Sequence, residues 1–75
     1  MNVMTKETFR TEHQRCIHEI HISTLPLETE NWIRRAYENI TAASGILTAQ
    51  DADYAKATID VIARKARKAR TSDEY

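Results

Sequence analysis

The sequence predicts a small all-α domain of three helices, in which the second and third helices form an antiparallel hairpin. Three stretches repeat apolar residues with the period of a helix, and two short connectors separate them. The 75 residues include one Gly and one Pro, which leaves little material for the tight turns of a β-sandwich or barrel. Ten Ala and eight Ile, against three Leu and two Val, indicate helices with small packing surfaces. The expected helices span about residues 5–21, 27–44 and 49–70, in a single helical domain (1–70) that is followed by a polar C-terminal tail (71–75).

The first expected helix, 5–21, starts at Thr5, whose hydroxyl can cap the free N–H groups of a first turn. Its end has two interpretations, because the apolar residues near this end alternate with polar neighbours as they would in a strand. The chain offers no second convincing strand to pair with, so we expect helix as far as His21, with an extended conformation of residues 17–23 as the alternative. The apolar side of this helix comprises Phe9, His13, Cys16 and Ile20.

The second expected helix, 27–44, has the best-defined end of the three. Pro26 suits the start of a helix, because its fixed φ angle and missing N–H are tolerated in a first turn. Gly45 is expected to end the helix in the left-handed conformation, with Ile46 making the hydrophobic contact that accompanies such a cap. The apolar stripe of this helix, which we expect in the core, comprises Trp32, Ile33, Ala36, Tyr37, Ile40 and Ala43.

The third expected helix, 49–70, opens with Thr48 and an acid three residues later, the pattern of a capping box. Its apolar residues recur at alternating steps of three and four and are mainly Ala, which lets another helix approach closely. A lone core of this size contributes roughly 3–5 kcal/mol, so the seam predicts a homodimer or higher oligomer. Tyr54 and Val61 lie off the seam and are available for a second contact. The seam comprises Ala52, Ala55, Ile59, Ile62, Ala66 and Ala69.

Several function classes are excluded by composition. A single Gly rules out the glycine-rich phosphate loops of nucleotide-binding folds. The longest run without a charge, at 39–50, has 12 residues and is far too short to span a membrane. Cys16 has no partner for an internal disulfide, and the first residues include no apolar signal segment. We therefore expect a cytoplasmic protein with no membrane contact.

The first helix carries a cluster of residue types that bind zinc, namely His13, Cys16, His18 and His21. At 100° per residue, however, the first two point away from His18, so one ion cannot be enclosed by all four on a regular helix. We expect Cys16 in the core, His13 half-buried beside it, and the other two solvated, with no metal and no cofactor. A metal site shared between subunits is the alternative, and the histidines could make stability or assembly depend on pH between roughly 5 and 7.

A catalytic role for Cys16 with His13 as its base is not favoured. Reactive thiols lie at helix N-termini or beside several cations, and no loop that could form an oxyanion hole accompanies this pair. A 75-residue helical chain also offers no evident cleft for a small-molecule substrate. We expect a protein that is not an enzyme.

The end of the third helix is strongly basic. Residues 64–70 carry five cations and no acid, whereas the whole chain has no net charge. Such a segment fits contact with nucleic-acid phosphates or with an acidic protein, although cations also stabilise the end of a helix. Two further cations stand beside the single Trp, a residue pairing typical of interface hot spots. The candidate partner-binding or nucleic-acid-binding residues are Arg64, Lys65, Arg67, Lys68, Arg70, Arg34 and Arg35.

Two functional hypotheses follow. The first is a non-enzymatic, small cytoplasmic accessory or regulatory protein that acts by protein–protein binding, for example as an inhibitor or modulator of a larger partner. The alternative is a nucleic-acid-binding protein that uses the basic end of its C-terminal helix. A helix-turn-helix with Gly45 at its turn would put Asp51 and Tyr54 at core positions, so sequence-specific DNA recognition is not favoured.

Overall fold

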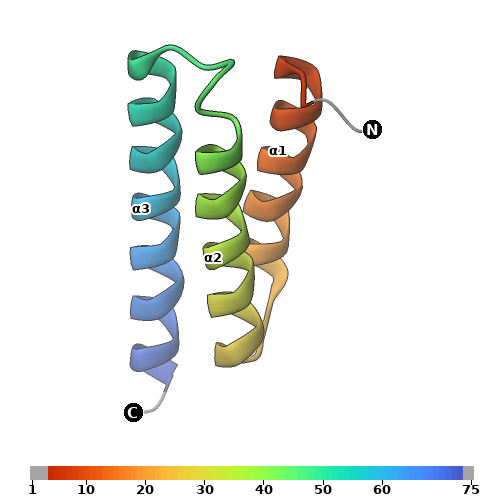
Figure 1. The fold of residues 1–75 in the computed structure, drawn as a ribbon. Coiled ribbons are helices and arrows are strands. Elements are labelled where there is room, and N and C mark those ends of the chain that lie inside the picture. Colours follow the sequence, from red (N-terminus) through yellow and green to blue (C-terminus); the bar gives the residue numbers. More distant parts are fainter. Residues whose placement is uncertain (1–3, 74–75) are drawn as a thin grey trace.

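The computed structural model describes residues 4–73, with the side chains described as far as Ala69. Within this part all regular secondary structure is helical, in the order α1 (Lys6–Ile22), α2 (Pro26–Ala42) and α3 (Ala49–Asp73). Figure 1 shows the chain descending in α1, returning in α2, and descending again in α3. The predicted all-α fold of three helices is therefore confirmed.

The helix boundaries differ from expectation by a few residues. The segment 17–22 is helical, so the extended alternative is wrong there, and the backbone becomes extended only at Ser23. The last helix continues to Asp73, beyond its expected end at 70, so the expected tail begins inside the helix. Residues 74–75 of that tail lie outside the described part of the chain.

Two helices start with the caps that the sequence predicts. At the start of α1 the backbone N–H of Thr8 donates to the Thr5 hydroxyl over 3.1 Å. At the start of α3 the N–H of Asp51 donates to the Thr48 hydroxyl over 3.1 Å. The start of α2 has no side-chain cap, and Pro26 stands in its first turn, where its missing N–H removes one unsatisfied donor.

The expectation for Gly45 is wrong. Gly45 does not have a positive φ angle, and neither does any other residue in the described part of the chain. The helix ends instead in a series of backbone turns, in which the N–H groups of Ile46 and Leu47 both donate to the carbonyl of Ala43, over 2.9 and 3.0 Å. Because these turns satisfy the free carbonyl without a left-handed residue, the connector does not require glycine.

The core lies between the three helices, and half of the ten buried apolar residues in the described part are small, namely four alanines and one cysteine. Close approach of the backbones compensates for the small volume of its four alanines. Two polar residues are also buried, and each is satisfied: the Thr29 hydroxyl donates to the Leu25 carbonyl over 3.0 Å, and the Asn39 amide donates to the Phe9 carbonyl over 3.3 Å. The buried apolar residues are Phe9, Cys16, Ile20, Ile33, Ala36, Ile40, Ala43, Ala55, Ile59 and Ala63.

The alanine-rich seam of α3 packs within this core. Ala55 and Ile59 are buried against the other two helices of the same chain, whereas Ala69 at the far end is exposed. Ala63, which the seam did not include, is buried with them. The seam is therefore occupied inside the monomer and no longer argues for an oligomer.

Candidate interaction surfaces

The cations singled out by the sequence are all exposed as far as the structure describes them, but they do not share one face. Arg64 and Arg67 lie along the side of α3 that faces α2, whereas Lys65 borders a hollow toward the end of α1. Arg34 lies in the groove between α2 and α3, and Arg35 faces α1. Lys68 is exposed, and the side chain of Arg70 lies outside the described residues.

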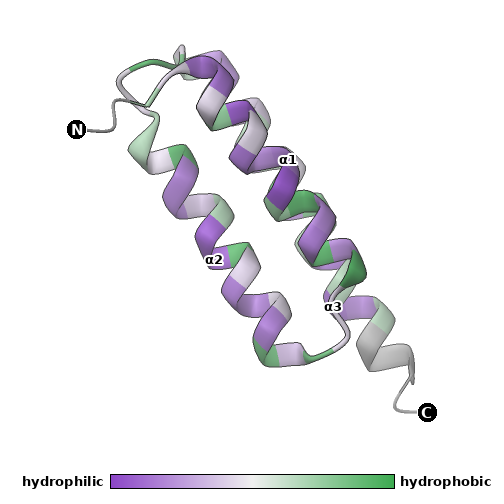
Figure 2. Cartoon of the chain, turned by 90° about the vertical axis from the view of Figure 1, so that its right-hand side faces the viewer, coloured by the Kyte–Doolittle hydropathy of each residue, from purple (hydrophilic) through white to green (hydrophobic). Residues whose placement is uncertain are grey.

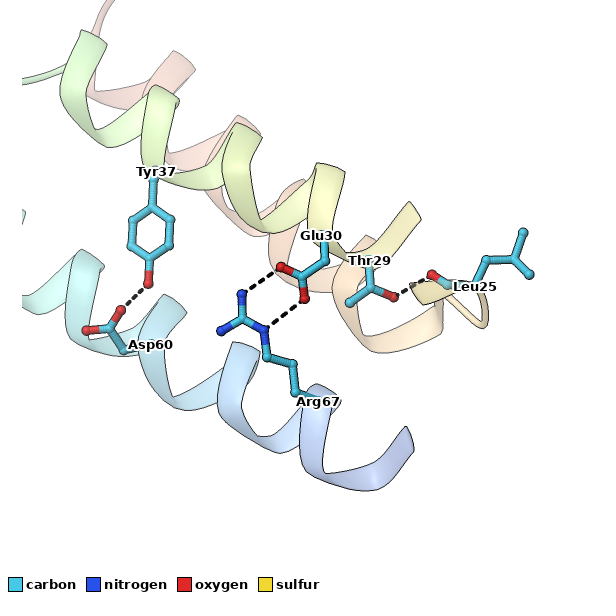
Figure 3. Close-up of polar contacts among 6 residues, drawn as sticks. All are labelled: Leu25, Thr29, Glu30, Tyr37, Asp60 and Arg67. Carbon is cyan, nitrogen blue, oxygen red and sulfur yellow. Dashed lines mark hydrogen bonds and ion pairs between the residues drawn. The ribbon is translucent and has the colours of Figure 1, made fainter. Parts of the chain in front are cut away.

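One of these cations is held by an acid from another helix. The Arg67 guanidinium donates from Nε to Oε2 of Glu30 over 2.8 Å, and from Nη2 to Oε1 over 2.6 Å (Figure 3). This bidentate geometry stabilises the charged guanidinium and raises the pKa of Arg67. The pair borders an open groove of 670 Å³ that also includes Arg34 and Glu38, so the groove carries both signs of charge.

A second polar contact joins the same two helices. The Tyr37 hydroxyl donates to the Asp60 carboxylate (Figure 3). Burial, together with this hydrogen bond and the nearby negative charge, raises the pKa of Tyr37 to about 12. Tyr37 packs against the core with its ring, in agreement with its predicted place there.

Trp32 is half-buried between two cations. The guanidinium of Arg15 on α1 lies 5.8 Å from the centroid of the indole ring, and that of Arg35 lies 5.1 Å from it. Arg35 also binds the Glu12 carboxylate, with 2.9 Å from Nε to Oε1. Arg35 therefore joins α1 to α2 and stabilises the fold, and it does not belong to a continuous basic surface.

The His and Cys residues of α1 do not form a metal site within the described part of the chain, where no group of three or more His, Cys, Asp or Glu residues is close enough. His13 stacks on Phe9 with 5.3 Å between ring centroids, and its buried Nδ1 has no hydrogen-bond partner. Burial lowers the pKa of His13. His18 and His21 are exposed, as expected.

The thiol of Cys16 is fully buried in the core. Burial and the neighbouring Glu12 carboxylate, 3.9 Å from Sγ, raise the pKa of this thiol. A buried thiol that is held protonated is a poor nucleophile. The environment of Cys16 is thus that of a small core residue.

The end of the bundle where α1 passes into α2 exposes three large apolar side chains, which we call the apolar tip: Ile22, Leu25 and Leu27. Their exposed fractions are 55%, 61% and 74%. In Figure 2 the connector and the first turn of α2 include hydrophobic segments, drawn in green. Helical periodicity does not identify these residues as a site, although three large apolar residues around a Pro and outside any helical stripe are a detectable signal.

A hollow of 420 Å³ adjoins the apolar tip. Ser23 and Thr24 of the connector form one side of it, and Lys65 and Ala69 of α3 form the other. The basic segment of α3 therefore lies beside the tip, so that one end of the bundle combines exposed apolar area with positive charge.

The outer side of α3 exposes a second apolar area, with Tyr54 at 77% and Val61 at 48%. Ala57 and Thr58 lie between these two residues along a shallow depression. None of the helices in residues 4–73 is long and apolar enough to cross a membrane. Searches of protein-family models, curated proteins and solved structures found no match to this chain.

Proposed function

We propose that this protein is a non-enzymatic binding module, an accessory or regulatory protein that docks onto a larger protein through its apolar tip. The observation that carries the proposal is the exposure of Ile22, Leu25 and Leu27 within six residues at one end of the bundle. A chain of this size has few large apolar residues, and placing three of them in water is costly unless a partner covers them.

The connector that bears the tip is held by hydrogen bonds. The single proton of the Ser23 hydroxyl is shared between the Ile20 carbonyl, 3.1 Å away, and the Thr29 hydroxyl. The Leu25 carbonyl accepts from both the N–H and the hydroxyl of Thr29, each over 3.0 Å (Figure 3). A connector fixed in this way loses little conformational freedom on binding, which favours affinity.

The charges around the tip indicate the chemistry of the partner. Lys65 borders the adjoining hollow, Lys68 is exposed one turn further along α3, and His21 lines the hollow from α1. Glu28, in the first turn of α2, is the nearest acid along the chain to Leu27. A partner surface with apolar side chains bordered by carboxylates would complement this end of the bundle.

Catalysis has little support from the geometry. The two hollows described between helices, beside Arg67 and beside the connector, are grooves at the surface, and the one thiol is buried with a raised pKa. The histidine with a perturbed pKa, His13, lies against Phe9 and not beside a nucleophile. These surroundings match a packed core rather than a reaction site.

Nucleic-acid binding remains the second candidate, on the strength of the exposed Arg64, Lys65 and Lys68. Its support is weaker, because Arg67 and Arg35 are ion-paired within the monomer and the cations face in different directions. Phosphate contacts need several cations that follow one backbone, and the described side chains do not form such a row.

The proposal is tested by a pull-down from a nuclease-treated lysate of the source organism, with the wild-type chain and the double variant Leu25→Ser, Leu27→Ser. Ser is a favourable N-cap residue and Leu25 is the N-cap of α2, so the variant is expected to keep its helices. Glu38→Ser serves as the matched control, because it replaces an exposed side chain of the same helix outside the apolar tip.

We expect one protein to be retained by the wild type and by the Glu38→Ser control, and to be lost from the double variant. Equal retention by all three chains would exclude the apolar tip as the binding surface. Retention of nucleic acid without nuclease, weakening steeply between about 50 and 200 mM salt, would favour the second candidate instead.

A further inference from the structure

The outer face of α3 is distinct from both the core and the apolar tip. Ala55 and Ile59 of this helix point into the core, whereas Tyr54, Ala57 and Val61 are exposed on the opposite side. The steps of three and four between the exposed residues place them in one line along the helix. The small Ala57 lies between the two larger side chains, so another helix can approach closely there.

Charges of opposite sign border this line at its two ends. Asp51 precedes Tyr54 by about one turn and Asp53 directly precedes it, whereas Arg64 and Lys65 follow Val61 by about one turn. All four side chains are exposed. Along α3 the exposed face is thus acidic on the N-terminal side of its apolar centre and basic on the C-terminal side.

We propose that this face binds the same face of a second copy of the chain, with the two α3 helices antiparallel about a two-fold axis near Thr58. In a two-fold dimer each copy uses the same patch, so the patch must complement itself when turned around. The antiparallel orientation places the acidic end of one helix against the basic end of the other. A parallel pair would place like charges together, which is unfavourable.

The helical spacing gives a definite register. With the axis near Thr58, Tyr54 of one copy lies opposite Val61 of the other, and each large side chain fits beside the small residues at the centre. Asp53 then lies on the same side of the interface as Arg64 of the second copy, and the two ends carry equivalent pairs.

The neighbouring helix limits which charges contribute. Lys6 and Arg10 of α1 line the hollow beside Asp51, so part of the negative charge of Asp51 is already offset within the monomer. Asp53 is outside that hollow. Arg64 lines the hollow toward α2, which an acid of α3 also lines, so part of its positive charge is offset in the same way. The pairing of Asp53 with Arg64 of the second copy supplies the remaining charge complementarity. Stable dimers bury roughly 800 Å² per partner, a large share for one helix face, so we expect dissociation in the micromolar range.

Sedimentation equilibrium of the full chain over a range of concentrations tests the dimer. We expect a monomer–dimer equilibrium, with a dissociation constant that rises at least about tenfold in Tyr54→Glu and in Val61→Glu. Lys56→Glu, a charge change on another side of the same helix, is the matched control and is expected to leave the constant within about threefold. A monomer at all concentrations, a larger oligomer, or a dimer insensitive to the first two variants would overturn the proposal.

The orientation is tested by charge reversal. Asp53→Arg and Arg64→Asp each create repulsion across the antiparallel interface and should weaken the dimer, whereas the double variant restores opposite charges and should recover wild-type affinity. One added cysteine gives an independent readout, because the native Cys16 is buried. Under oxidation, Thr58→Cys should form a disulfide-linked dimer rapidly and Tyr54→Cys slowly. Comparable cross-linking at both positions would indicate a parallel pair, and no recovery in the double variant would exclude the proposed register.

Discussion

The guanidinium of Arg67 on α3 lies against the carboxylate of Glu30 on α2. Two hydrogen bonds join them, one from Nε to Oε2 and one from Nη2 to Oε1. This pair ties the basic segment of α3 to the first half of the preceding helix, 37 residues earlier in the chain. The five cations of residues 64–70 are therefore not all available to a partner, because one of them already has an acidic partner within the monomer.

Removing the charge of Glu30 should weaken the fold modestly. Both side chains are about half exposed, 55% for Arg67 and 42% for Glu30, so solvent screens the pair. We expect Glu30→Gln to lower the free energy of unfolding by about 0.5–1 kcal/mol in dilute buffer, and by less at high salt. Denaturant unfolding at two salt concentrations measures this. Glu38→Gln, on the same helix, is the control, and an equal loss in the control would show that the ion pair contributes nothing specific.

Replacing Gly45 should stabilise the protein. The backbone there is not left-handed, and a Cβ atom added at this position would meet nothing within 4 Å. Ala also restricts the unfolded chain more than Gly does, so Gly45→Ala is expected to raise the free energy of unfolding by about 0.4–1 kcal/mol. Thermal or denaturant unfolding of the variant and the wild type measures this difference. A loss of stability would mean that the connector uses the left-handed conformation predicted from the sequence.

Stability should fall as the pH falls below the ordinary histidine pKa of 6.5, because of His13. Burial lowers the pKa of His13 in the folded state, so the unfolded chain binds a proton first. The loss begins near pH 6.5 and levels off below the lowered pKa of the folded state. We expect His13→Leu to reduce this dependence, whereas His18→Gln, at an exposed position, should retain it. Unfolding measured from pH 7.5 downward would contradict the account if both variants kept the wild-type slope.

The Tyr37 hydroxyl should remain protonated at unusually high pH. Its pKa in the folded state is about 12, against 10.0 for an ordinary tyrosine, owing to burial and the bond to Asp60. The unfolded chain therefore loses this proton first, and the stability contributed by the raised pKa is lost as the pH rises from about 10 to about 12. Phenolate absorbance should show a step near 12 that Tyr37→Phe removes and Asp60→Asn moves to lower pH. A wild-type titration without that step would contradict the observed contact.

The thiol of Cys16 should react only when the chain unfolds. It is fully buried and its pKa is raised, so a thiol reagent meets neither an accessible nor an ionised sulfur. The labelling rate in native buffer is expected to follow the opening of the fold and to rise steeply with denaturant. Rapid labelling of the folded chain would reopen a catalytic or redox role for this residue.

Helical periodicity was sufficient to predict the number of helices and most of the residues that face inward. The steps of three and four residues between apolar positions place Ile59 on the inner side of α3, whichever helix packs against it. The residue types at the helix starts identify Thr5 and Thr48 as N-caps. Periodicity does not say which helix covers an inward face. The alanine seam of α3 was therefore assigned to an oligomer, whereas α1 and α2 of the same chain cover it.

The candidate surfaces were less accessible to sequence reasoning, because each depends on residues that are distant in the chain. Nothing local indicates that Arg67 meets Glu30 or that Arg35 turns toward Glu12. The proximity of Lys65 to the connector at Ser23 likewise depends on how the helices pack. Counting charges along the sequence located the basic segment correctly. It could not show that the cations of this segment lie on different sides of the bundle.

The most direct test of the proposed function is site-specific photo-crosslinking in cells of the source organism, with a photoreactive residue in place of Leu25 in one chain and of Glu38 in another. Leu25 belongs to the apolar tip, whereas Glu38 lies in the groove between α2 and α3. The account predicts one cross-linked protein from position 25, identified by mass spectrometry, with carboxylates bordering the cross-linked apolar residues, and no such product from position 38. Cross-linking to nucleic acid at position 25, or the same protein product from both positions, would contradict it.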